Sequence, residues 1–240
     1  MANGSILSPY LDPTDTEGAA LQCLRMIDRH DKPINHPAVV SHAFGIDADE
    51  GTIPGMKACV DIAKRVVRVA RVVEFLRWWH LAHELGHFIG DMLGWPRPHD
   101  EAAIDDLAAR LWIRRSAVLR AVGIVGWNPA ALAGFFGQVP ASVVFRRVAV
   151  EAQGYAIGRD GMGRRFAYGP DGRRMPQAAT AWERNHLRIA MSGASEPFLR
   201  GTRRGGEVGP FDDDATGRRG AVILYPEEPE FLRPAPLFSL

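Results

Sequence analysis

The stretch Leu81-Ala82-His83-Glu84-Leu85-Gly86-His87-Phe88-Ile89 has apolar residues on both sides of a His-Glu-x-x-His core. We expect it to lie in a helix over residues 78–93. Residues four apart on a helix share a face, so His83 and His87 can place two imidazole nitrogens on one metal ion. Glu84 lies next to that face and can reach a metal-bound water. Two histidines with an adjacent carboxylate base are typical of zinc peptidases, whereas the alternative is a structural helix with two incidental histidines.

A catalytic zinc needs a third protein ligand and one open position. The segment 100–121 is predicted to be a second helix, because its apolar residues recur at a spacing of three and four: Ile104, Leu107, Ala108 and Leu111. Glu101 and Asp105 are four apart on it and share a face. We predict that Glu101 is the third ligand. Asp105 is then a carboxylate that accepts a hydrogen bond from the free N–H of a ligand histidine.

Other interpretations of these residues stay open. A carboxylate in the first helical turn, as at Glu101, is also favoured by the helix dipole alone. His99 is a rival third ligand in the Gly- and Pro-rich connection 88–100, which is expected to turn between the two helices. His80, three residues before His83, is expected to cap the helix or pack beside the site, with a fourth-ligand role less favoured.

Three segments together resemble the ImmA/IrrE family of zinc metallopeptidases. The first is Arg77–His87, which contains the Ala-His-Glu-Leu-Gly-His match. The second is Glu101-x-x-x-Asp105-x-Leu107-Ala108-Ala109-x-Leu111, and the third is Leu132-Ala133-x-x-Phe136-x-x-Val139-Pro140-x-x-Val143-x-x-Arg146. The resemblance covers about residues 20–155, and it departs from the usual pattern at His80, Ala103 and Arg114.

The resemblance implies a mostly helical, zincin-like metallopeptidase core with a small sheet before the His-Glu-x-x-His helix. A glutamate at the position of Glu101 recurs in thermolysin-like enzymes, which supports its role as a ligand. The implied cofactor is one Zn²⁺ per chain, although two histidines and a carboxylate also accept Mn²⁺, Fe²⁺ or Co²⁺. The implied substrate is one regulatory protein, typically a helix-turn-helix repressor in stress or mobile-element control.

Peptide hydrolysis also requires a group that stabilises the tetrahedral oxyanion. The candidates are Tyr155, His186 and Tyr168, in no order of preference. Two other functions remain alternatives to the peptidase: a zincin-like module that binds a repressor without cleaving it, and a DNA-binding regulator.

Composition excludes little. A net charge of +1 gives no overall attraction to nucleic acid or membrane. The two cysteines, Cys23 and Cys59, are too few for a disulfide framework. Residues 1–10 lack the basic start and long apolar run of a secretory signal, so the cytoplasm is the expected location. Residues 121–145 carry no charge, but their prolines and glycines favour two short buried helices over a membrane span.

The elements before the His-Glu-x-x-His helix are expected to be mostly short. An amphipathic helix is predicted over residues 16–30, with Asp15 or Thr14 as its cap, and a short helix opens at Asn35-His36-Pro37. Residues 46–56 are expected to be a loop. Strands are predicted at 58–62 and 66–70, with a helix over 63–77 as the alternative.

The fold class expected for the whole chain is α+β. We predict a metallopeptidase domain over 1–120 and a helix-turn-helix-like segment over 121–155, with helices at 129–136 and 140–152. Residues 156–240 are expected to form a smaller mixed or β-rich region that serves partner recognition or regulation.

Within the region 156–240 the pattern is weaker. The turn at Tyr168–Gly172 is expected to lie in a hairpin flanked by Phe166–Tyr168 and Met175. Residues 182–191 form a helix or a strand pair. A loop is expected over 201–220, and a strand over 221–225.

Overall fold

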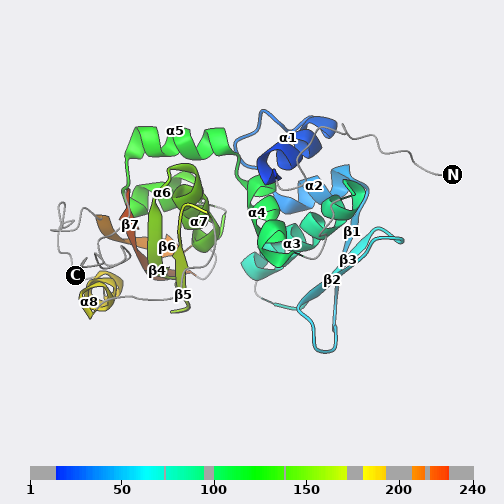
Figure 1. The fold of residues 1–240 in the computed structure, drawn as a ribbon. Coiled ribbons are helices and arrows are strands. Elements are labelled where there is room, and N and C mark those ends of the chain that lie inside the picture. Colours follow the sequence, from blue (N-terminus) through cyan, green and yellow to red (C-terminus); the bar gives the residue numbers. More distant parts are fainter. Residues whose placement is uncertain are drawn as a thin grey trace, which may run out of the picture. The chain divides into compact units, whose positions relative to one another are not determined.

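The computed structural model describes residues 15–72, 74–94, 100–137, 139–171, 181–192, 207–213 and 217–226. The chain divides into two compact units, Met1–Ala117 and Val118–Leu240. Both units combine helices with a small β-sheet (Figure 1), which confirms the α+β class. The predicted domain boundaries after residues 120 and 155 stay predictions.

The first unit builds its core around one long helix, α3. Its elements are α1 (Thr16–Met26), α2 (Pro37–Ala43), β1 (Asp47–Gly51), β2 (Ala58–Asp61), β3 (Val66–Ala70), α3 (Glu74–Met92) and α4 (Glu101–Trp112). The sheet has the order β1-β3-β2, with β1 parallel and β2 antiparallel to β3. Leu81, Leu85 and Ile89 of α3 are almost completely buried in one apolar cluster with residues from the other helices and from β3. The two strands predicted from β-branched residues are confirmed, and the alternative helix over 63–77 is wrong for its first half.

Strand β1 corrects the prediction of a loop over 46–56. Its residues Asp47 to Glu50 are exposed, so the strand has none of the apolar alternation that marks a buried strand. It exists because Asp47 to Gly51 pair with Val66 to Ala70 along the edge of the sheet. A partner far away in sequence, rather than a local pattern, therefore creates this strand.

Two predicted helices end earlier than expected. α1 ends at Met26 rather than residue 30, and Asp28 has a φ of 54°, which no right-handed helix contains. The helix predicted over 100–121 is two helices, because Ile113 is extended and forms a bridge with Ile34. α5 (Arg115–Val125) follows the break. The pairing of buried Ile113 with half-buried Ile34 outweighs the helical periodicity on either side.

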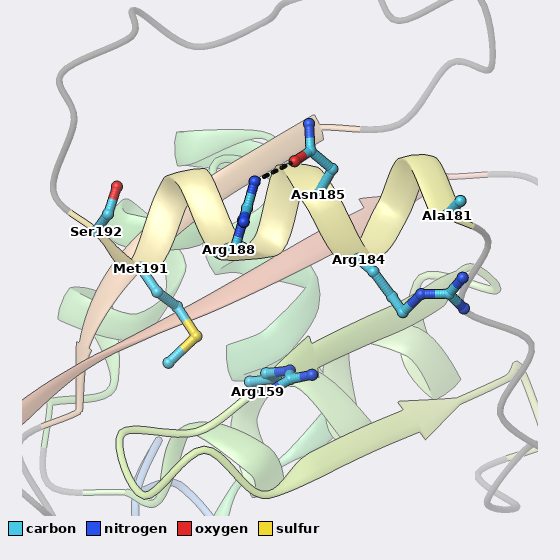
Figure 2. Close-up of a pocket in the computed structure, with 7 residues that line it drawn as sticks. All are labelled: Arg159, Ala181, Arg184, Asn185, Arg188, Met191 and Ser192. Atoms are coloured by element: carbon cyan, nitrogen blue, oxygen red, sulfur yellow. Dashed lines mark hydrogen bonds between the residues drawn. The ribbon is translucent and has the colours of Figure 1, made fainter.

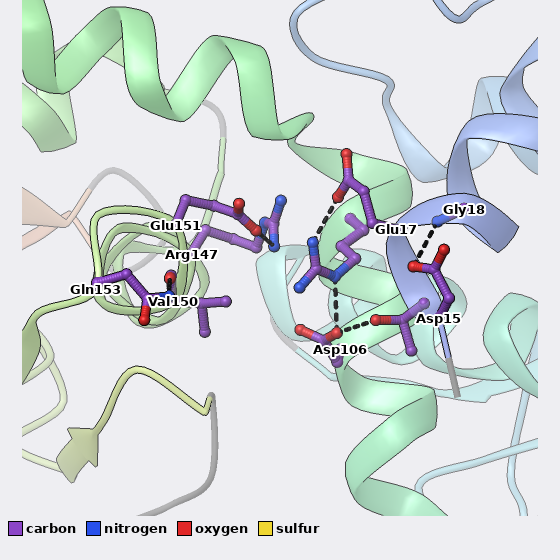
Figure 3. Close-up of polar contacts among 10 residues, drawn as sticks. Asp15, Glu17, Gly18, Asp106, Arg147, Val150, Glu151 and Gln153 are labelled. Carbon is purple, nitrogen blue, oxygen red and sulfur yellow. Dashed lines mark hydrogen bonds and ion pairs between the residues drawn. The ribbon is translucent and has the colours of Figure 1, made fainter. Parts of the chain in front are cut away.

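Polar contacts join α1 to α4. Asp15 caps α1 by accepting a hydrogen bond from the N–H of Gly18 at 2.9 Å (Figure 3). Arg110 of α4 donates to Glu17 of α1 and, at 2.7 Å, to Asp106 of its own helix. Asp106 also accepts from the hydroxyl of Thr16. These contacts fix the position of the helix that carries Glu101.

The second unit packs helices on a four-stranded sheet of order β5-β4-β7-β6. Its elements after α5 are α6 (Pro129–Phe135), α7 (Ala141–Glu151), β4 (Tyr155–Arg159), β5 (Arg165–Tyr168), α8 (Ala181–Met191), β6 (Glu207–Asp213) and β7 (Arg218–Tyr225). All neighbouring strands of this sheet are antiparallel.

The sheet corrects two predictions for the C-terminal region. Residues 207–213 and 218–220 are strands rather than loop, since β6 and β7 pair along their length. Phe166–Tyr168 lie in β5, whose partner is β4, whereas Met175 lies outside the described residues. Residues 182–191 are helical, as one of the two alternatives predicted.

The uncharged stretch 121–145 contains the end of α5, all of α6 and the start of α7. The short helices predicted at 129–136 and 140–152 are thus confirmed to within a residue or two. Within the described ranges, the structure contains no helix whose length and apolar character would let it cross a membrane.

α7 is buried along almost its whole length. Even Arg147 is completely buried, and its guanidinium donates to Glu151 at 2.6 Å (Figure 3). Such a pair is stable only while both partners remain, because each charge would otherwise be left in a poorly solvated interior. α7 is therefore a core helix of the second unit.

Candidate metal centre

Helix α3 presents two histidines from consecutive turns on one face. The Nε2 atoms of His83 and His87 lie 3.2 Å apart. Both side chains are mostly buried, with 19% and 15% of their surfaces exposed. The local i, i+4 spacing alone accounts for this pairing.

Glu101, the first residue of α4, completes a cluster of three candidate ligands. Its Oε2 lies 3.1 Å from Nε2 of His83, and its Oε1 lies 3.7 Å from Nε2 of His87. Ligands about 2.0 to 2.1 Å from a tetrahedral zinc ion are separated from one another by about 3.3 Å. The three separations therefore suit one zinc ion. Within the described residues this is the one cluster that meets the distance requirement for a metal site.

Asp105 determines which ring nitrogen of His83 has a lone pair available for a metal ion. The Nδ1 atom of His83 lies 2.9 Å from Oδ1 of Asp105. A carboxylate only accepts, so Nδ1 carries the proton and, in neutral His83, the Nε2 lone pair faces His87 and Glu101. Burial lowers the pKa of His83, but the hydrogen bond and charge of Asp105, with the charges of Glu84 and Glu101, outweigh it and raise the pKa.

We expect Asp105→Asn to weaken zinc binding by about 10- to 100-fold, because it removes the charge that orients and polarises His83. Competition against a zinc-chelating dye measures the affinity. Asp91→Asn is the matched control, since Asp91 is an exposed carboxylate on α3 outside the cluster. Equal zinc affinities for wild type and Asp105→Asn would show that Asp105 has no role in zinc binding.

Glu84 is buried, with only 8% of its surface exposed. Burial raises its pKa, the charges of His83 and His87 lower it and that of Glu101 raises it, with a net upward shift. A hydrogen bond from the backbone of Val60 in β2 also acts on this carboxyl. Glu84 thus lies within electrostatic reach of all three ligand candidates.

Gly86, between the two histidines, allows α3 and α4 to approach closely. A Cβ atom at this position would lie 3.0 Å from Cγ2 of Ile104 and 3.1 Å from its backbone oxygen. Sequence reasoning missed this role, although a glycine inside a helix costs about 1 kcal/mol relative to alanine and so signals a packing requirement.

We expect Gly86→Val to destabilise the first unit by about 1–3 kcal/mol, since the added side chain must displace the backbone of α4. It should also weaken zinc binding because Glu101 moves with that helix. Chemical denaturation and zinc titration measure the two effects. Gly123→Val is the control, because a Cβ atom at Gly123 of α5 would meet nothing within 4 Å. Equal losses in both variants would show that helix propensity alone is responsible.

The remaining candidates lie elsewhere. His80 lies inside α3, which begins at Glu74, so it does not cap that helix. His99 lies outside the described residues. Tyr155, Tyr168 and His186 belong to the second unit, in β4, β5 and α8, and their role in stabilising an oxyanion stays a prediction.

Comparison with known proteins gives little to add to this geometry. No family model matches the chain, and no curated protein gives a significant match. Among solved structures, a Mycobacterium tuberculosis transcriptional regulator is similar with a TM-score of 0.49 and 14% identity, over 86% of this chain and 76% of that chain. A likeness at this level carries no functional argument.

Proposed function

We propose that this protein is a zinc-dependent endopeptidase. The observation that carries the proposal is the convergence of His83, His87 and Glu101 at separations that suit one zinc ion, beside the buried carboxyl of Glu84. The three sequence segments that resemble the ImmA/IrrE family support the same reaction.

The roles of the residues follow from their chemistry. A zinc ion bound by the three ligands would polarise the scissile carbonyl and lower the pKa of a water molecule. Glu84 accepts a proton from that water and donates it to the leaving amine. Its raised pKa favours the first step, because a carboxylate with a higher pKa is a stronger base. Asp105 holds the ring of His83 in its binding tautomer.

A polypeptide substrate is supported by the sheet beside α3. β2 lies at one edge of the order β1-β3-β2, and Val60 in this strand contacts Glu84. An extended peptide can pair with an open strand edge through backbone hydrogen bonds. Glu101 has 69% of its side-chain surface exposed, which leaves the cluster accessible from that side.

The proposed substrate, a helix-turn-helix repressor cleaved in the cytoplasm during stress or mobile-element control, rests on the family resemblance. DNA binding through 129–152 is disfavoured because both arginines of α7 are buried and cannot reach base edges. A module that binds a repressor without cleaving it stays the alternative, although it would have no use for Glu84 as a base.

New peptide termini in a native extract of the source cells would test the proposal. Extract is incubated with the zinc-loaded chain, with the chain plus a zinc chelator, or alone, and termini are identified by mass spectrometry. We expect termini from one or a few proteins in the first sample only. A chain that binds zinc stoichiometrically and produces no new termini would favour the non-cleaving module.

A further inference from the structure

The second unit contains a pocket of about 660 Å³ between α8 and the end of β4 (Figure 2). Three arginines line it: Arg159, Arg184 and Arg188. The other lining residues are uncharged: Ala181, Asn185, Met191 and Ser192. No carboxylate is among the described residues that line this pocket. Its lining is therefore strongly cationic, although the whole chain has a net charge of only +1.

The arginines reach the pocket from two elements. Arg184 and Arg188 are four apart on α8 and share a face of the helix. Arg159 is the last residue of β4 and lies on the same sheet face as Ile157, which packs in the apolar cluster with Leu187 of α8. The tertiary fold thus brings three arginines from two elements to the lining of one pocket.

Two carboxylates that neighbour these arginines in the sequence are engaged with other groups. Asp160, next to Arg159, pairs with Arg164 at 2.6 Å. Glu183, next to Arg184, is buried and accepts a hydrogen bond from the hydroxyl of Tyr225 at 2.7 Å. Arg188 donates to the neutral amide of Asn185 at 3.0 Å. Among the residues that the structure describes, neither Arg159 nor Arg188 forms an ion pair.

One wall of the pocket is apolar. Met191 lines the pocket and also packs against the apolar cluster of the second unit. In Figure 2 its side chain extends from α8 toward the strand that carries Arg159. The pocket is far larger than an inorganic phosphate and falls in the usual size range of small-molecule sites, about 300 to 1,000 Å³.

We propose that this pocket binds a small organic phosphate, with the phosphate held by Arg159, Arg184 and Arg188 and the organic group against Met191. Guanidinium groups donate paired hydrogen bonds to phosphate oxygens, and several of them match the two negative charges of a phosphomonoester. A hollow between helix and strand favours a compact ligand over a nucleic-acid backbone, which runs along a surface. The proposal is independent of the metal centre.

The test uses the full chain and phenyl phosphate as the probe, with inorganic phosphate and phenol for comparison. Arginine Nε–H resonances are followed by NMR at constant ionic strength, and those of Arg159 and Arg188 are assigned from variants. We expect phenyl phosphate to shift both resonances and to bind more tightly than inorganic phosphate, whereas phenol has no effect.

Arg159→Gln and Arg188→Gln should each weaken phenyl phosphate binding by about tenfold or more, as expected for loss of a charged hydrogen bond. Arg120→Gln, which changes an exposed arginine of α5, should bind as wild type does. Arg188 is exposed on α8, so its variant is expected to fold, which unchanged backbone spectra would verify. Absence of binding at millimolar concentrations, equal binding in all three variants, or displacement of the probe by duplex DNA would each overturn the proposal.

Discussion

Wild-type protein should bind one zinc ion per chain, and His83→Ala and Glu101→Ala should each weaken that binding by at least about 100-fold. The expectation follows because each change removes one of the three proposed ligands, and even loss of an outer contact costs about 10- to 100-fold. Metal content after dialysis and competition with a chelating dye provide the measurements. The wild-type chain should also melt at a higher temperature with zinc than without it, since a ligand that binds the folded state preferentially stabilises that state.

His42→Ala is the matched control for this experiment. His42 is an exposed histidine in the last turn of α2, outside the ligand cluster, and its loss should leave zinc binding unchanged. Zinc loss in His83→Ala but not in Glu101→Ala would keep a metal site but reopen its third ligand, with His99 as the next candidate. A wild-type chain that binds no zinc when it is supplied would remove the basis for the proposed peptidase.

Glu84→Gln should keep zinc and lose about 10²- to 10⁴-fold in cleavage rate. Glutamine has nearly the same shape as glutamate, so it still fills the buried space that Glu84 occupies. However, an amide cannot accept the proton of the attacking water. The rate is measured on the protein whose new termini identify it as the substrate, and zinc content is measured on the same preparations.

Glu74→Gln, at the exposed start of α3, controls for loss of a negative charge on the same helix and should cleave as wild type does. Full activity in Glu84→Gln would exclude Glu84 as the base. Loss of both zinc and activity would indicate that Glu84 supports the site structurally.

Local sequence predicted the elements whose stability is local. The spacing of His83 and His87 predicted that they share a helix face, and the structure places their Nε2 atoms 3.2 Å apart. Asp100 caps α4 through the N–H groups of Ala102 and Ala103, which sets the start of the helix at Glu101. The β-branched residues of β3 predicted a strand because such residues suit a half-buried pleated surface.

Sequence patterns failed where a distant partner decides the conformation. Strand β1 is acidic and exposed, and it is a strand only because it pairs with β3. Ile113 leaves the helix to pair with Ile34, 79 positions earlier, and so divides a stretch with continuous helical periodicity. The hairpin of β6 and β7 was predicted largely as loop because its glycines and charges resemble those of a turn region.

By itself, the sequence determined the two histidines, the adjacent glutamate and the helix that aligns them, because contacts four residues apart depend only on helix geometry. Tertiary structure alone decided that Glu101 and Asp105 meet His83, 3.1 Å and 2.9 Å from its two ring nitrogens. That meeting depends on the close packing of α3 against α4. The packing is possible because Gly86 has no side chain to clash with Ile104. The meeting also depends on the contacts of Thr16 and Glu17 with α4, which join residues about 90 positions apart.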